Sequence, residues 1–141
     1  MKILPLVLCL LTLPQIAHAV SGSQVTLYSG TAVTADATGA AYCFPYTTTE
    51  GIQFTLDATY NSGSSTLDVK LQDSDVSTSG STHWSDLPST SFTQVTTSSA
   101  HRRVTPPCGT VILKCVRAII DVGGSGSPNY DVVVKAFFKV K

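Results

Sequence analysis

The fold class is indicated first by residues 52–60, which have the sequence IQFTLDATY. Apolar residues alternate with polar ones: Ile52, Phe54, Leu56, Ala58 and Tyr60 in one set, and Gln53, Thr55, Asp57 and Thr59 in the other. Successive side chains of a strand point to opposite faces, so the pattern predicts a half-buried strand over 53–61. After the turn-rich residues 61–65, a second alternation places Leu67, Val69 and Leu71 on one face. We expect the two strands to form an antiparallel hairpin.

Two more strands are predicted near the C-terminus. In the first, one face consists of Val116, Ala118, Ile120 and Val122. Residues 123–128, rich in Gly and Ser, end this strand. In the second, apolar residues occupy alternate positions over 130–140. Its other face also carries Val133 and Phe137, so we expect another element or another subunit to cover part of that face.

Weaker strand patterns occupy much of the remaining chain. They lie at residues 24–29, 31–35, 39–44, 83–87, 91–96 and 100–104. Short strands joined by Gly-, Ser- and Pro-rich connections are typical of an all-β fold. We predict a single antiparallel β-sandwich, or jelly-roll-like domain, of about 8–10 short strands.

The N-terminus predicts export. Lys2 precedes an uncharged apolar run at residues 3–13, and the triplet Ala17-His18-Ala19 suits a signal peptidase. We predict a signal peptide over 1–19 and a β-sandwich domain over 20–141 of a secreted, periplasmic or cell-surface protein. The apolar run is shorter than the roughly 20 residues that span a bilayer, so we expect no membrane insertion after signal removal.

Three cysteines follow the predicted signal: Cys43, Cys108 and Cys115. In an oxidising compartment we expect one disulfide and one remaining thiol. On one straight strand Cys108 and Cys115 would lie about 23 Å apart, which is too far to bridge. Cys43 with either partner is therefore favoured, although a loop at Pro106-Pro107 could bring Cys108 back toward Cys115.

Charge is nearly balanced in the predicted mature chain. The sequence has nine Asp and Glu and nine Lys and Arg, and only Lys2 lies in the signal, which leaves nine negative and eight positive residues. This balance argues against a nucleic-acid partner. Arg102-Arg103 is too short for a basic patch, and we expect solvated strand surface there.

Catalytic groups are scarce. His83 and His101 are the histidines that follow the signal, Glu50 is the single glutamate, and no G-x-S-x-G motif fixes a serine nucleophile. We predict that the protein is not an enzyme and uses no cofactor.

Clustered aspartates raise the possibility of calcium binding. The candidates are Asp68, Asp73, Asp75 and Asp86, with Ser74 between the middle two. Carboxylates of this kind suit a hard cation, but the glycine and distal glutamate of a calcium loop are absent. A solvated turn between strands is the favoured interpretation of residues 73–75, and no metal site is predicted.

One aromatic cluster is a candidate binding site. His83 and Trp84, followed by Asp86, would offer an aromatic platform for a sugar ring or an anchor for another protein. The alternative is that Trp84 packs in the core at an edge of the sandwich, as a single tryptophan in a small sandwich more often does.

Several stretches together resemble small structural proteins of tailed bacteriophages and prophages. The stretches are residues 25–29, 65–74, 84–88, 92–96, 116–118, 122–124 and 127–128. The resemblance implies a non-enzymatic β-sandwich that attaches to or packs within a virion, as a head-decoration or accessory protein, and that forms an oligomer. The export signal and cysteines fit an exported relative of such a module that is used at the cell surface. A second likeness is to discoidin-type carbohydrate-binding sandwiches.

Two function hypotheses follow. The first is a structural or assembly protein, of a virion or a cell surface, that associates with itself or with other proteins through the sandwich edges and through the face with Val133 and Phe137. The second is a carbohydrate-binding or adhesive module that binds a glycan through end-loop residues around His83, Trp84 and Asp86.

Overall fold

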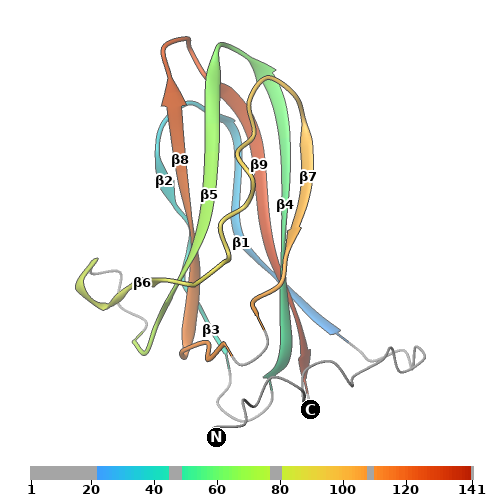
Figure 1. The fold of residues 1–141 in the computed structure, drawn as a ribbon, viewed down its shortest axis with the longest axis vertical. Helices are drawn as coiled ribbons and strands as arrows, with labels where there is room; N and C mark the ends of the chain where they lie inside the picture. Colours follow the sequence, from blue (N-terminus) through green and yellow to red (C-terminus); the bar gives the residue numbers. More distant parts are fainter. Residues whose placement is uncertain (1–21, 45–48, 77–80, 108–109, 141) are drawn as a thin grey trace, which may run out of the picture.

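The computed structural model describes residues 22–44, 49–76, 81–107 and 110–140. These residues form two antiparallel sheets that pack face to face as a β-sandwich, and no α-helix occurs among them (Figure 1). The predicted all-β sandwich is confirmed. The predicted signal peptide and Cys108 lie outside the described residues.

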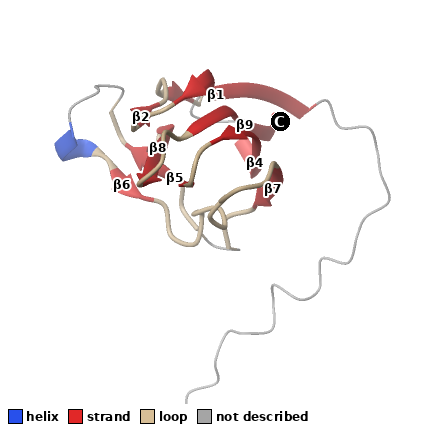
Figure 2. Cartoon of the chain, turned by 90° about the horizontal axis from the view of Figure 1, so that it is seen from above, coloured by secondary structure: helices blue, strands red, loops and turns tan. Residues whose placement is uncertain are grey.

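The first sheet has four strands in the order β1-β9-β4-β7. Their bounds are β1 (Gly22–Val33), β9 (Asn129–Val140), β4 (Thr49–Ser62) and β7 (Ala100–Val104). In the view of Figure 2, β1 and β7 lie at opposite margins of this layer.

The second sheet has five strands, with β2-β8-β5-β6 in order and β3 pairing with β8 beside β2. Their bounds are β2 (Ala37–Thr38), β8 (Cys115–Gly124), β5 (Ser65–Ser74), β6 (Ser85–Asp86) and β3 (Tyr42–Cys43). A short 3-10 turn, η1 (Ser81–His83), precedes β6.

The core lies between the sheets, where the predicted alternations place their apolar side chains. The buried set from the four long inner strands is Phe54, Leu56, Ala58, Leu67, Val69, Leu71, Val116, Ala118, Ile120, Tyr130, Val132, Val134, Ala136 and Phe138. Each large aliphatic side chain buried here contributes roughly 1.5–3 kcal/mol. The hydroxyl of Tyr130 donates to the Thr96 carbonyl oxygen at 2.6 Å and accepts from Ser65 Oγ at 3.0 Å, so its polar end is satisfied.

The predicted hairpin between residues 53–61 and 66–72 is wrong. Strand β4 pairs with β9 and β7, whereas β5 pairs with β8 and β6, so the chain crosses between sheets at their connection. Gly63 makes the crossing with a φ of +101°, and a Cβ there would lie 2.2 Å from the Ser127 carbonyl oxygen. Alternation shows that a strand has one buried face, but both sheets bury their inner faces against the same core. The two-residue alternation of apolar and polar residues therefore cannot show to which of the two sheets a strand belongs.

The weaker strand predictions have mixed outcomes. The strands predicted at residues 24–29 and 31–35 are one strand, β1, which ends at Val33, so residues 34–35 lie outside it. Its pairing with β9 shifts register between Thr26 and Tyr28 and again between Gly30 and Val33. Residues 100–104 form β7 as predicted. The strands predicted at 39–44 and 83–87 shrink to the two-residue β3 and β6.

The strand predicted at residues 91–96 is replaced by an irregular segment that runs alongside β5 in space. Its contacts are isolated: Phe92 N donates to Val69 O at 2.9 Å, and Val95 exchanges backbone bonds with Leu67 at 2.8 and 3.0 Å. Pro88, which has no N–H, and Ser89, with a φ of +57°, precede this segment and interrupt a continuous ladder. Segment 87–96 therefore covers the edge of β5 beyond β6 without forming a strand.

Candidate interaction surfaces

The outer face of the five-stranded sheet carries most of the predicted binding residues, and we call it the disulfide face. It comprises Lys70, Gln72, Trp84, Asp86 and Arg117 with the Cys43–Cys115 disulfide. Residues 115, 117, 119 and 121 point outward on β8 because residues 116, 118 and 120 point into the core.

Trp84 packs on this face and not within the core cluster. It is only 7 % exposed, and the Arg117 guanidinium carbon lies 4.3 Å from the centre of its ring. Arg117 is itself 8 % exposed, and its Nε and Nη2 donate to Gln72 Oε1 at 3.0 and 2.8 Å. This burial lowers the pKa of the guanidinium. The Arg117 guanidinium thus covers one face of the indole through a cation–π contact and is itself hydrogen-bonded to Gln72.

Asp86 extends the same network toward solvent. Gln72 Nε2 donates to Asp86 Oδ1 at 2.7 Å, and Lys70 Nζ lies 2.8 Å from Asp86 Oδ2. The hydrogen bonds from Lys70 and then Gln72 lower the pKa of the Asp86 carboxyl below its ordinary value. His83, at the end of η1, is exposed. The structure thus places Asp86 and Trp84 in one network through Gln72 and Arg117, a connection that the sequence did not reveal.

The disulfide joins β3 to β8. Cys43 and Cys115 are direct partners across the two strands, and their sulfur atoms are bonded. The prediction that Cys43 pairs with one of the other two cysteines is confirmed, with Cys115 as the partner. A disulfide suits an extracytoplasmic protein. No helix in the described part of the chain is long and apolar enough to cross a membrane.

The predicted solvated turn at residues 73–75 is wrong for its first two residues. Asp73 and Ser74 end β5 and are 6 % and 0 % exposed. Asp73 Oδ2 accepts a hydrogen bond from the backbone N–H of Leu113 at 2.9 Å, so it anchors the segment before β8. Asp75 is exposed. Within the described ranges, no group of three or more His, Cys, Asp and Glu side chains is placed to hold a metal ion.

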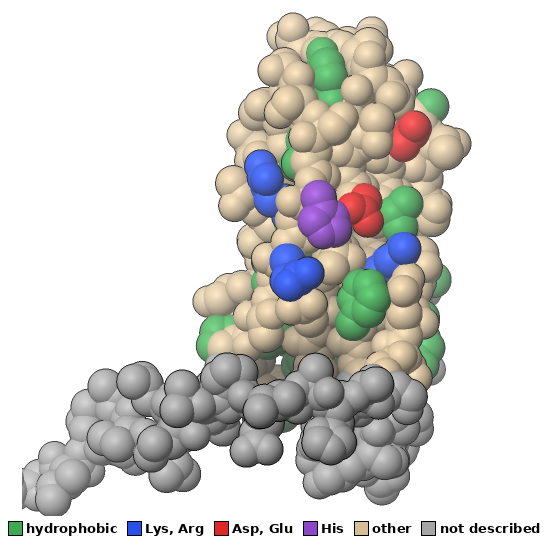
Figure 3. Space-filling view, turned by 90° about the vertical axis from the view of Figure 1, so that its right-hand side faces the viewer, with side chains coloured by type: hydrophobic (Ala, Val, Ile, Leu, Met, Phe, Trp, Pro, Cys, Tyr) green, Lys and Arg blue, Asp and Glu red, His purple; other side chains and the backbone are tan. Residues whose placement is uncertain are grey.

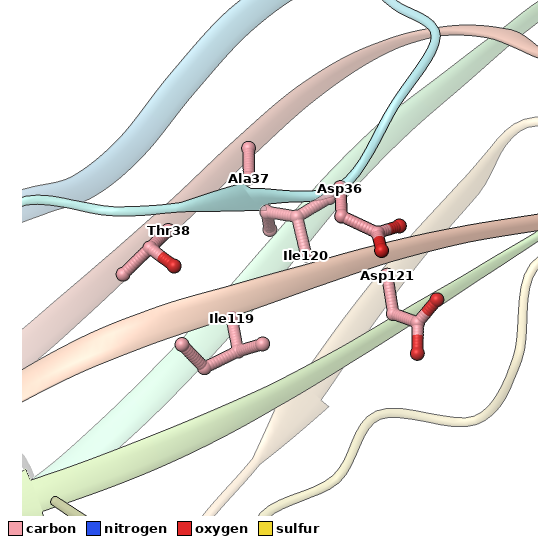
Figure 4. Close-up of a pocket in the computed structure, with 6 residues that line it drawn as sticks. All are labelled: Asp36, Ala37, Thr38, Ile119, Ile120 and Asp121. Carbon is pink, nitrogen blue, oxygen red and sulfur yellow. The ribbon is translucent and has the colours of Figure 1, made fainter. Parts of the chain in front are cut away.

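A shallow hollow of about 230 Å³ lies where β2 pairs with β8. It is lined by Asp36, Ala37, Thr38, Ile119, Ile120 and Asp121 (Figure 4). The carboxylates of Asp36 and Asp121 point to the same side, and Asp36 Oδ1 accepts from the backbone N–H of Val122 at 2.8 Å. Asp36 therefore ties the start of β2 to β8.

The outer face of the four-stranded sheet, which we call the β9 face, has a different composition. Its middle strand presents Val133, Lys135 and Phe137, all half-buried. In the register, Phe137 lies between Gln24 of β1 and Gln53 of β4. No described strand packs over Val133 and Phe137, so the cover by another element or subunit stays a prediction.

Charge gathers on the β7 side of this face. His101 of β7 pairs with Asp57 of β4 through Nδ1 and Oδ1, and both side chains are exposed. Arg102 and Arg103 are exposed as predicted. Figure 3 shows a histidine beside an acidic side chain, with basic and apolar side chains near them.

Two large apolar side chains project from the segment before β8. Val111 is 78 % exposed and Leu113 is 43 % exposed. Between them Ile112 packs against the core, so the alternation of exposed and buried side chains continues outside a named strand.

No family model matches the chain, and neither a curated protein nor a solved structure matches it.

Proposed function

We propose that the chain is an exported, non-enzymatic structural or assembly protein that makes subunit or surface contacts through the β9 face and the sheet edge beside it. The observation that carries the proposal is the position of Phe137 and Val133 on the outward side of a middle strand. The outward positions of an antiparallel sheet that faces water are ordinarily polar.

The surroundings of Phe137 support a protein contact. Gln24 and Gln53, its partners on the two neighbouring strands, are uncharged. Protein interfaces are depleted of charge at their centres and enriched in aromatic residues. Lys135 is the charged residue between Val133 and Phe137 on β9, and the His101–Asp57 pair lies toward β7, where it would belong to the rim of a contact.

Export and the type of assembly follow from the sequence with support from the disulfide. The predicted signal peptide and the Cys43–Cys115 bond favour a secreted, periplasmic or cell-surface location. The resemblance to phage structural proteins favours a virion accessory protein or a related cell-surface assembly. The sandwich fold is of the kind that this resemblance implies.

The glycan-binding alternative has less support. A sugar ring stacks on an aromatic face that solvent can reach, but Trp84 is 7 % exposed and Arg117 lies over its ring. His83 and Asp86 are exposed, yet Asp86 is engaged by Lys70 and Gln72. The geometry therefore favours a packing role for Trp84.

Sedimentation velocity of residues 20–141 over a wide concentration range tests the proposal. We expect concentration-dependent association, which Phe137→Ser weakens by roughly tenfold, equivalent to about 1.4 kcal/mol. Val111→Ser is the matched control, because it removes a more exposed apolar side chain outside the β9 face. A strict monomer at high concentration, or equal weakening by both substitutions, would contradict the proposal.

A further inference from the structure

The four edges of the two sheets are protected unequally. The edge strand β7 has five residues, and His101, Arg102 and Arg103 are exposed on it. The edge strands of the other sheet, β2, β3 and β6, have two residues each. Short edge strands and charged side chains are the ordinary devices that prevent pairing with another chain. In contrast, β1 has twelve residues and contains neither a charged residue nor a proline.

The unprotected part of β1 is its first five residues, Gly22–Thr26, which we call the open edge. On the side away from β9 no described strand pairs with it. Beyond it, the register shift between Thr26 and Tyr28 interrupts the ladder. Gly39 then approaches so closely that a Cβ there would lie 2.2 Å from the Leu27 carbonyl oxygen. The chain after β1 therefore contacts the strand at Leu27 and Tyr28, whereas no described strand lies beside Gly22–Thr26 on the side away from β9.

We propose that the open edge pairs antiparallel with the open edge of a second copy of this chain, centred on Gln24, so that two four-stranded sheets become one of eight strands. This inference rests on the proposed function and names its partner. Two-fold pairing places Gln24 opposite its own copy, and an uncharged strand meets no like charge there. The contact uses the same patch on both copies, so it closes as a dimer.

The joined sheet also extends the surface beside Phe137. Gln24 is the register partner of Phe137, so the second copy's strand would lie two strands away from it. Neighbouring strands are about 4.8 Å apart, which puts that strand roughly 10 Å from β9, with Gln24 between it and Phe137. Pairing therefore enlarges the sheet surface beside Phe137 without itself covering that side chain.

Charge at the open edge tests the pairing. Light scattering after size exclusion should give twice the monomer mass for residues 20–141. Ser23→Lys with Gln24→Lys should raise the dimer dissociation constant at least roughly tenfold, because like charges then meet across the two-fold axis. Ser29→Lys with Thr31→Lys is the matched control, since it adds the same charge at exposed positions of β1 beyond the open edge. Equal dissociation constants for the two double variants would overturn the inference.

A register-specific cross-link gives a second readout. With Cys108→Ser as background, Gln24→Cys should form a covalent dimer under mild oxidation, while Ser29→Cys should remain monomeric on a denaturing gel. Suppose that Phe137→Ser weakens association, but that Ser23→Lys with Gln24→Lys leaves it unchanged and Gln24→Cys forms no cross-link. That result would refute the strand pairing and leave the proposed function standing. If the wild-type chain stays monomeric and the Gln24→Cys variant forms no cross-link, both the strand pairing and the proposed function are refuted.

Discussion

The two outer faces of this sandwich differ in how completely their side chains satisfy one another. On the disulfide face, Arg117 covers Trp84 and donates to Gln72, and Gln72 donates to Asp86. On the β9 face, Phe137 lies outward between two glutamines, next to a sheet edge without charge. Groups that partner one another mainly stabilise the fold, whereas groups left facing outward are available to a partner. Substitutions on the first face should therefore change unfolding, and substitutions on the second should change association.

The largest expected effect is loss of the Cys43–Cys115 disulfide. The bond spans 72 residues, and in the chain-entropy model closing a loop of that length contributes about 4 kcal/mol. Urea unfolding of Cys43→Ser with Cys115→Ser should show a loss of that order, and the wild type under reductant should match it. An unchanged unfolding midpoint would show that this bond does not constrain the unfolded chain.

Trp84→Ala should have the next largest effect on stability. Removing a buried tryptophan costs roughly 3–5 kcal/mol, and we expect about 3 kcal/mol here because Trp84 lies outside the core cluster. The substitution also exposes Arg117 and its contact with Gln72. Trp84→Phe should recover part of the loss, because it keeps an aromatic ring beneath the guanidinium. If Trp84→Ala left the unfolding free energy within about 0.5 kcal/mol of the wild type but abolished glycan-array binding, the disulfide face would be a ligand site.

Phe137→Ser should show the opposite pattern, with a small effect on stability and a larger effect on association. A half-buried side chain on an outer face contributes about 1 kcal/mol or less to folding, so its denaturant midpoint should move little. Its association constant should change more than its stability does. A large loss of stability without any change in association would remove the difference between the two faces.

The smallest effect concerns the pH dependence of Asp86. Its folded-state pKa is lowered, so the contribution of the carboxylate is present above its unfolded pKa, near 4, and is lost as pH falls through the folded value. Because Asp86 and Lys70 are partly exposed, the expected contribution is about 0.5 kcal/mol or less. Wild type and Asp86→Asn should differ in urea unfolding at pH 7, and the difference should shrink as the pH falls below the unfolded pKa and through the lowered folded one. A difference that grows at low pH would contradict this sign.

The sequence predicts the strands and the core well, because both depend on local alternation. Phe54 and Leu56, Val116 and Ala118, and Val132 and Val134 are all buried as the alternation predicts. The pairing of strands is not local, which explains why the expected hairpin of β4 with β5 is absent. The isolated bridge of Val95 with Leu67 likewise depends on contacts far apart in sequence.

The candidate surfaces are less predictable for the same reason. Trp84, Asp86 and Phe137 stand out in the sequence, but their partners do not. Arg117 occupies an outward strand position that resembles any solvated arginine, and only the fold brings it over Trp84. The unprotected edge of β1 emerges only once strand order is known, because the same residues in a middle strand would be unremarkable.

Hydrogen exchange of residues 20–141 at low and high protein concentration tests the difference between the two faces most directly. We expect amide protection to rise with concentration in Gly22–Thr26 and in peptides of β9, while peptides that contain Trp84 and Asp86 exchange at the same rate at both concentrations. Protection that rises instead around Trp84 and Asp86, or nowhere in the chain, would contradict the account.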